Sequence, residues 1–175
     1  MLDIVQNSVK AQASLIEIAV TECAKSDTLA ITVTDNGCGM TDETAQRALD
    51  PFYTTRTTRK VGLGLPLLKM AAQLTGGGVT ITSQLGVGTT VRAVFGLSHI
   101  DRMPLGSMCE TMTTLISCNP HIDFVYTHTV RSANECESTF VLDTRQFREV
   151  LGEVPLSSPE VMAFIKEYFA QNDVV

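Results

Sequence analysis

The chain has 175 residues and a mass of 19.0 kDa, and 44% of its residues are hydrophobic, which predicts a folded protein of one domain, or one domain with a small appendage. Its net charge of −6 and pI near 5.0 argue against a nucleic-acid partner, because phosphate binding relies on clustered Lys and Arg. No apolar run approaches the roughly 20 residues of a membrane span and no secretory signal opens the chain, so we expect a cytoplasmic protein without a membrane partner.

The cysteines form no CxxC pair and have no paired histidine spacing, which predicts reduced thiols rather than a zinc site or disulfides.

Apolar periodicity predicts the elements of the first half of the chain. Thr41 is a good N-cap for a helix over 41–49, and Pro51 ends that helix. In order, we expect a helix over 2–13, strands over 15–20 and 29–33, helices over 41–49 and 64–74, and strands over 79–81 and 91–94.

The second half has a different pattern. Residues 104–117 look helical, starting at Pro104, and 122–130 and 139–144 look like strands. Ser158 caps a last helix that has Pro159 in its first position.

Short motifs stand along the first half in a distinctive order. Asn7 lies on the first predicted helix, and Asp35–Met40 (DNGCGM) follows the second strand. Then come Asp50–Arg56 (DPFYTTR), Gly62–Leu65 (GLGL) and Gly86–Thr89 (GVGT). Together they resemble the nucleotide pocket of the GHKL superfamily, the ATPase fold shared by DNA gyrase, mismatch-repair ATPases and sensor histidine kinases.

The resemblance implies a fold and a domain division. It covers about residues 1–97 and implies an α+β fold of the Bergerat type. This is a two-layer α/β sandwich, in which helices cover one face of a mixed, mostly antiparallel sheet. Residues 98–175 are expected to form a small α/β C-terminal appendage packed on this ATP-binding domain.

Asp35 is the candidate for base recognition. It ends an apolar strand, and a buried carboxylate there accepts a hydrogen bond from the amine of adenine. Gly37 and Gly39 let the backbone approach the ring, and Met40 completes the motif. The alternative is a type I′ hairpin turn, for which Asp-Asn-Gly is also a common sequence.

The phosphates of the nucleotide would be bound by a separate motif. No GxxxxGK[ST] motif is present, so Gly62, Leu63, Gly64 and Leu65 are the candidates, at a helix start whose free N–H groups bind phosphate oxygens. An ordinary glycine loop is the alternative. Thr89 matches the last motif of the superfamily, where a threonine supports the adenine-binding aspartate, although β-propensity also explains a threonine there.

The first helix supplies the metal and water candidates. Asn7 is the expected Mg²⁺ ligand, and Lys10 on the same helical face is placed to meet a phosphate. Asp3 stands where hydrolytic members carry a catalytic glutamate, and its shorter side chain predicts slow hydrolysis. The alternative is that Asp3 is only an acidic residue at a helix N-terminus, where it meets the helix dipole. In the lid-like segment 51–61, Arg56, Arg59 and Lys60 are candidates to close over the phosphates, or solubilise an exposed loop.

Ser98–Leu105 resembles the phosphoacceptor box of histidine kinases. The acid Asp101 follows His99 by two positions instead of one, and the box comes after the ATPase region instead of before it. We therefore expect His99 to be an ordinary structural histidine beside a Pro-initiated helix.

The chain resembles stand-alone bacterial histidine-kinase-like ATP-binding proteins, and this resemblance implies three candidate functions. The first is a Mg-ATP-binding regulatory or signalling module, the second a protein kinase, either a rearranged autokinase that uses His99 or a kinase acting on a partner, and the third a slow ATPase. The ligands would be ATP, ADP and Mg²⁺. A protein partner is expected, with a hydrogenase-related or redox protein as one candidate, and a homodimer is left open.

Overall fold

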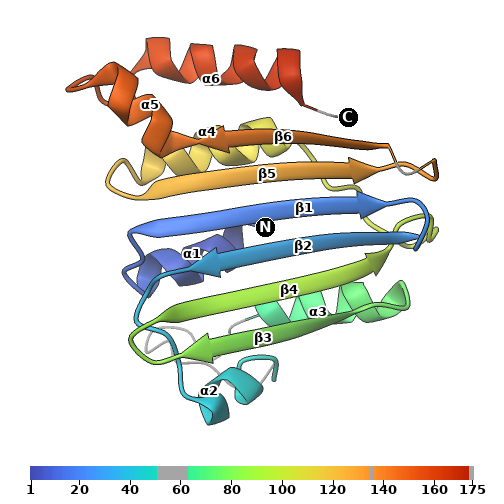
Figure 1. The fold of residues 1–175 in the computed structure, drawn as a ribbon. Coiled ribbons are helices and arrows are strands. Elements are labelled where there is room, and N and C mark those ends of the chain that lie inside the picture. The colour runs from blue at the N-terminus through green and yellow to red at the C-terminus, as the bar shows by residue number, and fades with distance from the viewer. Residues whose placement is uncertain (51–62, 135, 174–175) are drawn as a thin grey trace.

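A computed structural model describes residues 1–50, 63–134 and 136–173, and its central feature is a six-stranded sheet with strand order β3-β4-β2-β1-β5-β6 (Figure 1). All strand pairings are antiparallel except the parallel pair β1–β5. The helices are α1 (Leu2–Lys10), α2 (Asp42–Arg47), α3 (Gly64–Leu74), α4 (Met108–Cys118), α5 (Thr144–Leu151) and α6 (Pro159–Asn172). The strands are β1 (Leu15–Cys23), β2 (Thr28–Asp35), β3 (Gly78–Gln84), β4 (Gly88–Gly96), β5 (Asp123–Arg131) and β6 (Glu137–Asp143).

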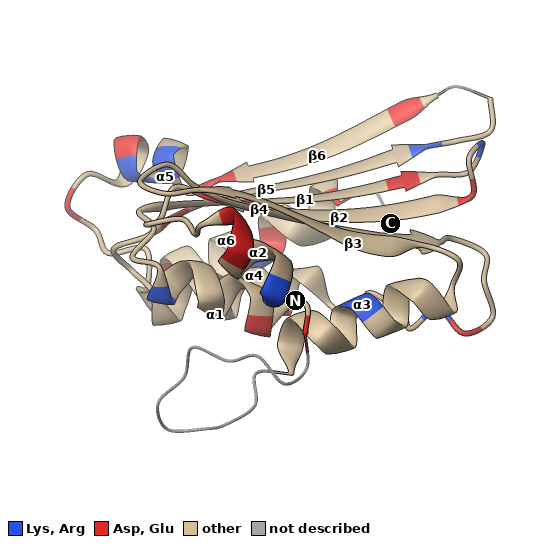
Figure 2. Cartoon of the chain, turned by 90° about the horizontal axis from the view of Figure 1, so that it is seen from below, with Lys and Arg blue, Asp and Glu red and all other residues tan. Residues whose placement is uncertain are grey.

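The helices α1, α3, α4 and α6 cover one face of this sheet (Figure 2). Strand side chains alternate between the two faces, so every second residue points towards these helices. On β1 the inward residues are Ile16, Ile18 and Val20, and on β5 they include Phe124 and Tyr126, all of which are buried. The predicted fold class, a mixed and mostly antiparallel sheet with helices on one face, is confirmed.

The C-terminal strands continue the same sheet. β5 pairs with β1 along its whole length, from Asp123 opposite Leu15 to Arg131 opposite Cys23, and β6 forms the outer edge. The aromatic rings of β5 and β6 pack against Phe169 of α6, with the Tyr126 and Phe169 ring centroids 5.6 Å apart. No helix in the described part of the chain is long and apolar enough to cross a membrane.

Several element boundaries differ from the expectations, each for a local reason. α1 ends at Lys10, because Gln12 adopts a positive φ of 58° that a helix does not allow. α4 starts at Met108 with the Ser107 hydroxyl as its cap, and not at Pro104, since Gly106 between them has a φ of 78°. Residue 144 belongs to α5, a helix that the sequence reading missed.

Candidate nucleotide-binding site

A cavity of about 300 Å³ lies at the end of the sheet where β2 ends and β4 begins, between α1, α2 and the start of α3. The predicted site residues that line the cavity are Asp3, Asn7, Lys10, Asp35, Gly39, Met40, Gly64, Leu65 and Thr89. The other residues of its wall are mostly small or apolar and include Ile4, Ala11, Ala48 and Val91. The structure thus brings together residues from four separate segments of the chain.

One face of α1 forms a wall of the cavity. Asp3, Asn7 and Lys10 are exposed and line it, because positions i, i+4 and i+7 of a helix share one face. Ile4 and Val5 are buried in the core. The polar face is therefore held in place by the packing of the apolar one.

Asp35 is the most buried charged group of the cavity, with 8% of its surface exposed. Its Oδ1 accepts a hydrogen bond of 2.9 Å from the Gly37 N–H, and its Oδ2 accepts one of 2.6 Å from the Ser8 hydroxyl. The chain continues from Asp35 to α2 instead of turning back into a hairpin, and Asn36 is not among the described residues with positive φ. The alternative of a type I′ turn is therefore wrong.

Gly37 and Gly39 are required by contacts within the protein itself. A Cβ on Gly37 would stand 2.7 Å from the Ala11 Cβ of the α1 end, and one on Gly39 would stand 2.0 Å from the Gln84 carbonyl oxygen. Gly39 also has a φ of 65°, which side chains other than glycine rarely adopt. These close approaches hold the segment after Asp35 between α1 and the β3–β4 turn. Gly37 is itself buried and does not belong to the cavity lining.

Thr89 faces Asp35 across the β2–β4 pair and lines the cavity. The Thr89 hydroxyl forms a 2.8 Å hydrogen bond with the Ser83 hydroxyl. The hydroxyl that donates to Asp35 is that of Ser8. Ser83 also accepts a 2.8 Å hydrogen bond from the Met40 N–H. The residues Ser8 and Ser83 were missed by the sequence reading; a polar residue on the apolar face of a helix, as Ser8 is, was the available signal.

The start of α3 opens onto the same cavity. Gly64 and Leu65 line it, ahead of the first helical bond, which runs from the Leu67 N–H to the Leu63 carbonyl. Asp3 lies beside this helix start, since a Cβ on Gly64 would stand 3.4 Å from its Oδ2. Leu63 is the exposed N-cap residue and is not part of the lining. The candidates Arg56, Arg59, Lys60 and Gly62 lie outside the described residues.

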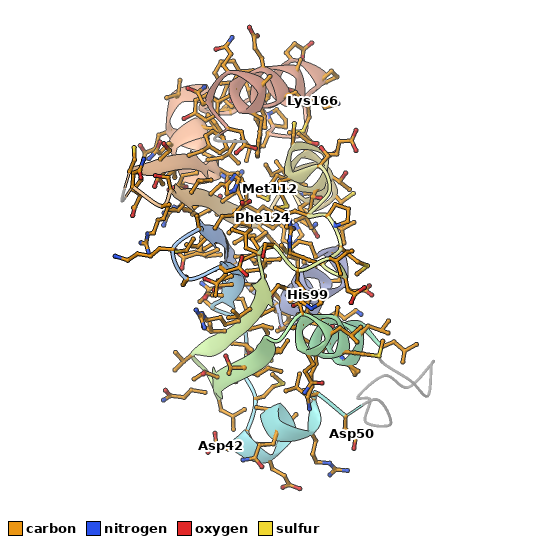
Figure 3. All side chains as sticks on the ribbon, turned by 90° about the vertical axis from the view of Figure 1, so that its right-hand side faces the viewer. Asp42, Asp50, His99, Met112, Phe124 and Lys166 are labelled. Atoms are coloured by element: carbon orange, nitrogen blue, oxygen red, sulfur yellow. The ribbon has the colours of Figure 1, made fainter. Side chains whose placement is uncertain are left out.

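His99 lies at the other end of α3. Figure 3 shows His99 close to this helix. The Gly96 N–H donates to the hydroxyl of Thr75, the C-cap of α3, and the His99 N–H donates to the Gly96 carbonyl. The 11 residues of α3 span about 16 Å between this point and Gly64. The His99 Nδ1 lies 3.2 Å from the Asp101 backbone nitrogen and 3.9 Å from the Asp101 carboxylate.

The family described as histidine kinase-, DNA gyrase B-, and HSP90-like ATPase matches residues 1–99. A putative sensor protein of Shewanella frigidimarina is 34% identical over 103 residues, which are 58% of this chain and 16% of that protein. The histidine protein kinase DivJ of Caulobacter vibrioides is 36% identical over 95 residues, 52% of this chain and 16% of DivJ. This chain therefore spans only about a sixth of the length of these two relatives.

A solved structure shows the same fold further along the chain. The crystal structure of the N-terminal domain of a DNA repair protein superposes with a TM-score of 0.54 at 17% identity, over 81% of this chain and 50% of that one. At that identity the likeness concerns the fold alone. Because the family match covers more than half of the sequence, the chain belongs to the histidine kinase-, DNA gyrase B- and HSP90-like ATPase family.

Proposed function

We propose that the chain binds ATP with Mg²⁺ in this cavity and acts as a nucleotide-dependent regulatory or signalling module with slow or no hydrolysis. The observation that carries the proposal is a buried carboxylate, Asp35, and a helix start, Gly64–Leu65, around one cavity. A carboxylate accepts from the amine of adenine, and helix-start N–H groups bind phosphate oxygens. The cavity of about 300 Å³ is at the lower end of the usual range for small-molecule sites.

Asn7 and Lys10 suit the remaining charges of the ligand. Both side chains are exposed on the cavity wall, between Asp35 and the start of α3. Asn7 offers a neutral amide oxygen, which fits a Mg²⁺ ion whose charge the phosphates balance. Lys10 offers an ammonium group for a phosphate oxygen. In this proposal Asn7 would hold the metal, and bound Mg²⁺ would supply positive charge against the phosphates.

Slow hydrolysis follows from the setting of Asp3. Its carboxylate lies beside the start of α3, and it is itself in the first turn of α1. A general base must reach its water at about 2.6–3.2 Å, and the aspartate side chain is one methylene shorter than the glutamate of hydrolytic members.

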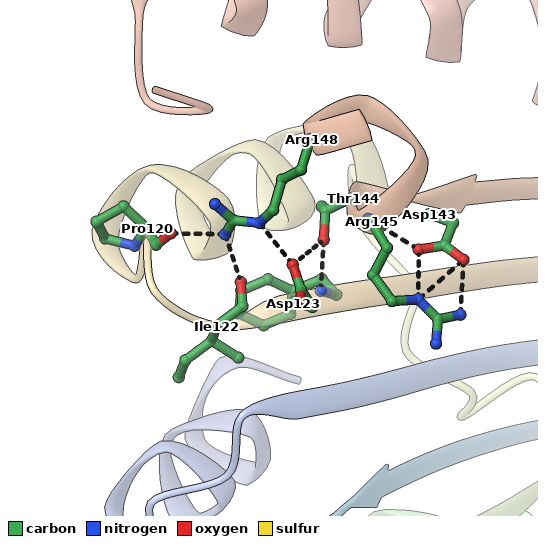
Figure 4. A network of polar contacts seen from close by, with 8 residues as sticks. Pro120, Ile122, Asp123, Asp143, Thr144, Arg145 and Arg148 are labelled. Atoms are coloured by element: carbon green, nitrogen blue, oxygen red, sulfur yellow. Dashed lines mark hydrogen bonds and ion pairs between the residues drawn. The ribbon is translucent and has the colours of Figure 1, made fainter. Parts of the chain in front are cut away.

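A regulatory role is supported by a hydrogen-bonded path from the site to the C-terminal region. The Asn36 Oδ1 accepts from the N–H groups of Ser14 and Leu15, at 2.9 Å each, and the Ser14 carbonyl accepts from the Asp123 N–H at 2.9 Å. In Figure 4, the Asp123 carboxylate then accepts from Thr144 and Arg148 of α5. We propose that residues 98–175 form the part that transmits nucleotide occupancy to a protein partner.

Phosphoryl transfer to a partner protein is the second candidate, and it is favoured by the relatives that are named as histidine protein kinases. His99 of the same chain is a poor acceptor, because it lies at the far end of α3, about 16 Å from Gly64 along the helix. Incubation with γ-labelled ATP should therefore leave no acid-labile label on His99. Label that rises with protein concentration and disappears in His99→Gln would favour a homodimeric autokinase instead.

The direct test of the proposal is calorimetric titration with ATP and ADP, with and without Mg²⁺, followed by phosphate release measured over hours. We expect binding of both nucleotides and turnover far below the common enzyme value of about 10 s⁻¹. Binding of ATP no tighter than that of inorganic phosphate would contradict it. A partner protein that accelerates phosphate release or accepts the phosphoryl group would decide between the module and the kinase.

A further inference from the structure

We propose that Ser8 is a positioning residue that makes the pocket specific for a base with an amino group, by holding Asp35 as an oriented hydrogen-bond acceptor. The inference rests on the proposed ATP site and adds a specificity determinant to it. No role for Ser8 follows from the sequence motifs, which place function on its neighbour Asn7.

The contact between the two side chains is short and buried. The Ser8 hydroxyl donates to the Asp35 Oδ2 at 2.6 Å, which is at the short end of the range for O–H···O hydrogen bonds. Ser8 is 4% exposed and Asp35 is 8% exposed, and both line the cavity. A bond between buried groups is strengthened by the low local dielectric, and an unmade one is costly.

The two donors on Asp35 also fix its direction. The Gly37 N–H binds Oδ1 and the Ser8 hydroxyl binds Oδ2, so the carboxylate cannot rotate without breaking a buried bond. Each oxygen keeps a further lone pair, and both remaining positions are acceptors. Adenine presents an amino group to such a site. A base with a carbonyl group at that position, such as guanine, would meet another acceptor.

Ser8 is held in this position by the packing of α1. The helix buries Ile4 one turn before Ser8, and its end docks on the segment after Asp35, where the Cys38 N–H donates to the Ala11 carbonyl at 2.9 Å. This arrangement leaves a simpler role open, in which Ser8 only fastens α1 to the sheet. The two roles predict different affinities. If Ser8 positions Asp35, its loss weakens only nucleotides that carry the amino group; if Ser8 only attaches α1 to the sheet, its loss weakens nucleotides with and without that group alike.

The experiment uses two ligands that differ in that group alone, ATP and purine riboside triphosphate, which lacks the 6-amino group. Affinities are measured by calorimetry in Mg²⁺ for the wild type, Ser8→Ala, Ser8→Thr and the matched control Ser158→Ala. Ser158 is a half-buried serine at the start of α6, and its buried hydroxyl has no partner in the described residues. A second pair, Asp35→Asn with and without Ser8→Ala, tests whether Ser8 acts through Asp35.

We expect Ser8→Ala to weaken ATP about tenfold, the effect of one charge-assisted bond, and to change the affinity for the analogue less than about twofold. Ser8→Thr and Ser158→Ala should stay near the wild type, and in the Asp35→Asn background the effect of Ser8→Ala should vanish. Equal losses for both nucleotides, or no loss for ATP, would overturn the role of Ser8 while leaving the ATP site intact. Failure of the wild type to bind either nucleotide would contradict the proposed function, and the role of Ser8 with it.

Discussion

Replacing Asp35 with asparagine removes the charge at the base of the pocket and keeps the shape of the side chain. Alanine is the less informative change. It would leave the Ser8 hydroxyl and the Gly37 N–H buried without an acceptor, at a cost of about 1–3 kcal/mol each. A total of roughly 2–6 kcal/mol is a large part of the stability of a small domain, about 5–15 kcal/mol. Asparagine keeps one acceptor oxygen, so we expect that variant to stay folded.

The expected loss in binding comes from one contact. The asparagine has one acceptor and one donor group, so a donor now competes for the position that faces the amine of adenine. Loss of a buried hydrogen bond costs about 1–3 kcal/mol, which is about a 5- to 150-fold decrease in ATP affinity. The carbonyl of guanine accepts from the new donor, so the preference for ATP over GTP should shrink by more than the ATP affinity does.

The assay is calorimetric titration with ATP and GTP, alongside thermal denaturation to confirm the fold. Asp27→Asn is the matched control, because Asp27 lies in the β1–β2 turn and bonds the Ser98 N–H and hydroxyl. ATP binding by Asp35→Asn as tight as that of the wild type would refute the assignment of Asp35. So would equal losses for ATP and GTP in a variant that melts normally.

Three further predictions concern the neighbouring groups. Asn7→Ala should weaken ATP at least tenfold in Mg²⁺ but ADP without Mg²⁺ less than about twofold, by calorimetry, because a metal ligand acts only when the metal is bound; equal losses would make Asn7 structural. Asp3→Glu should leave phosphate release unchanged or raise it, whereas fast wild-type turnover that Asp3→Asn abolishes would contradict a compromised base. Hydrogen bonds from Ser26 lower the pKa of the Cys23 thiol, while burial raises the pKa of the Cys109 thiol. Iodoacetamide near pH 7 should therefore alkylate Cys23 before Cys109, as followed by peptide mass spectrometry, and the reverse order would refute this.

Much of the site was predictable because its signals are local. The spacing of Asp3, Asn7 and Lys10 defines one helical face from sequence alone, and the structure places all of them on the cavity wall. Asp35 was recognisable as the polar end of an apolar strand. What the spacing could not show is why Gly37 and Gly39 are needed, since their close neighbours, Ala11 and Gln84, are distant in the sequence.

The C-terminal region was harder to predict because its structure depends on non-local contacts. The parallel pairing of β5 with β1 joins residues more than a hundred positions apart and leaves no periodic signal of its own. α5 was missed because it starts directly where β6 ends. Asp143, the last residue of β6, caps it by accepting from the Arg145 N–H, and Thr144 turns inward to accept from the Phe124 N–H.

The measurement that tests the central claim most directly is a crystal structure of the chain with Mg²⁺ and a non-hydrolysable ATP analogue. We predict the amine of adenine within hydrogen-bond distance of the Asp35 carboxylate, the phosphates at the N–H groups of Gly64 and Leu65, and Mg²⁺ on the Asn7 amide oxygen. No in-line water should be held by Asp3. An analogue bound away from Asp35, or phosphates that do not touch the start of α3, would contradict the account.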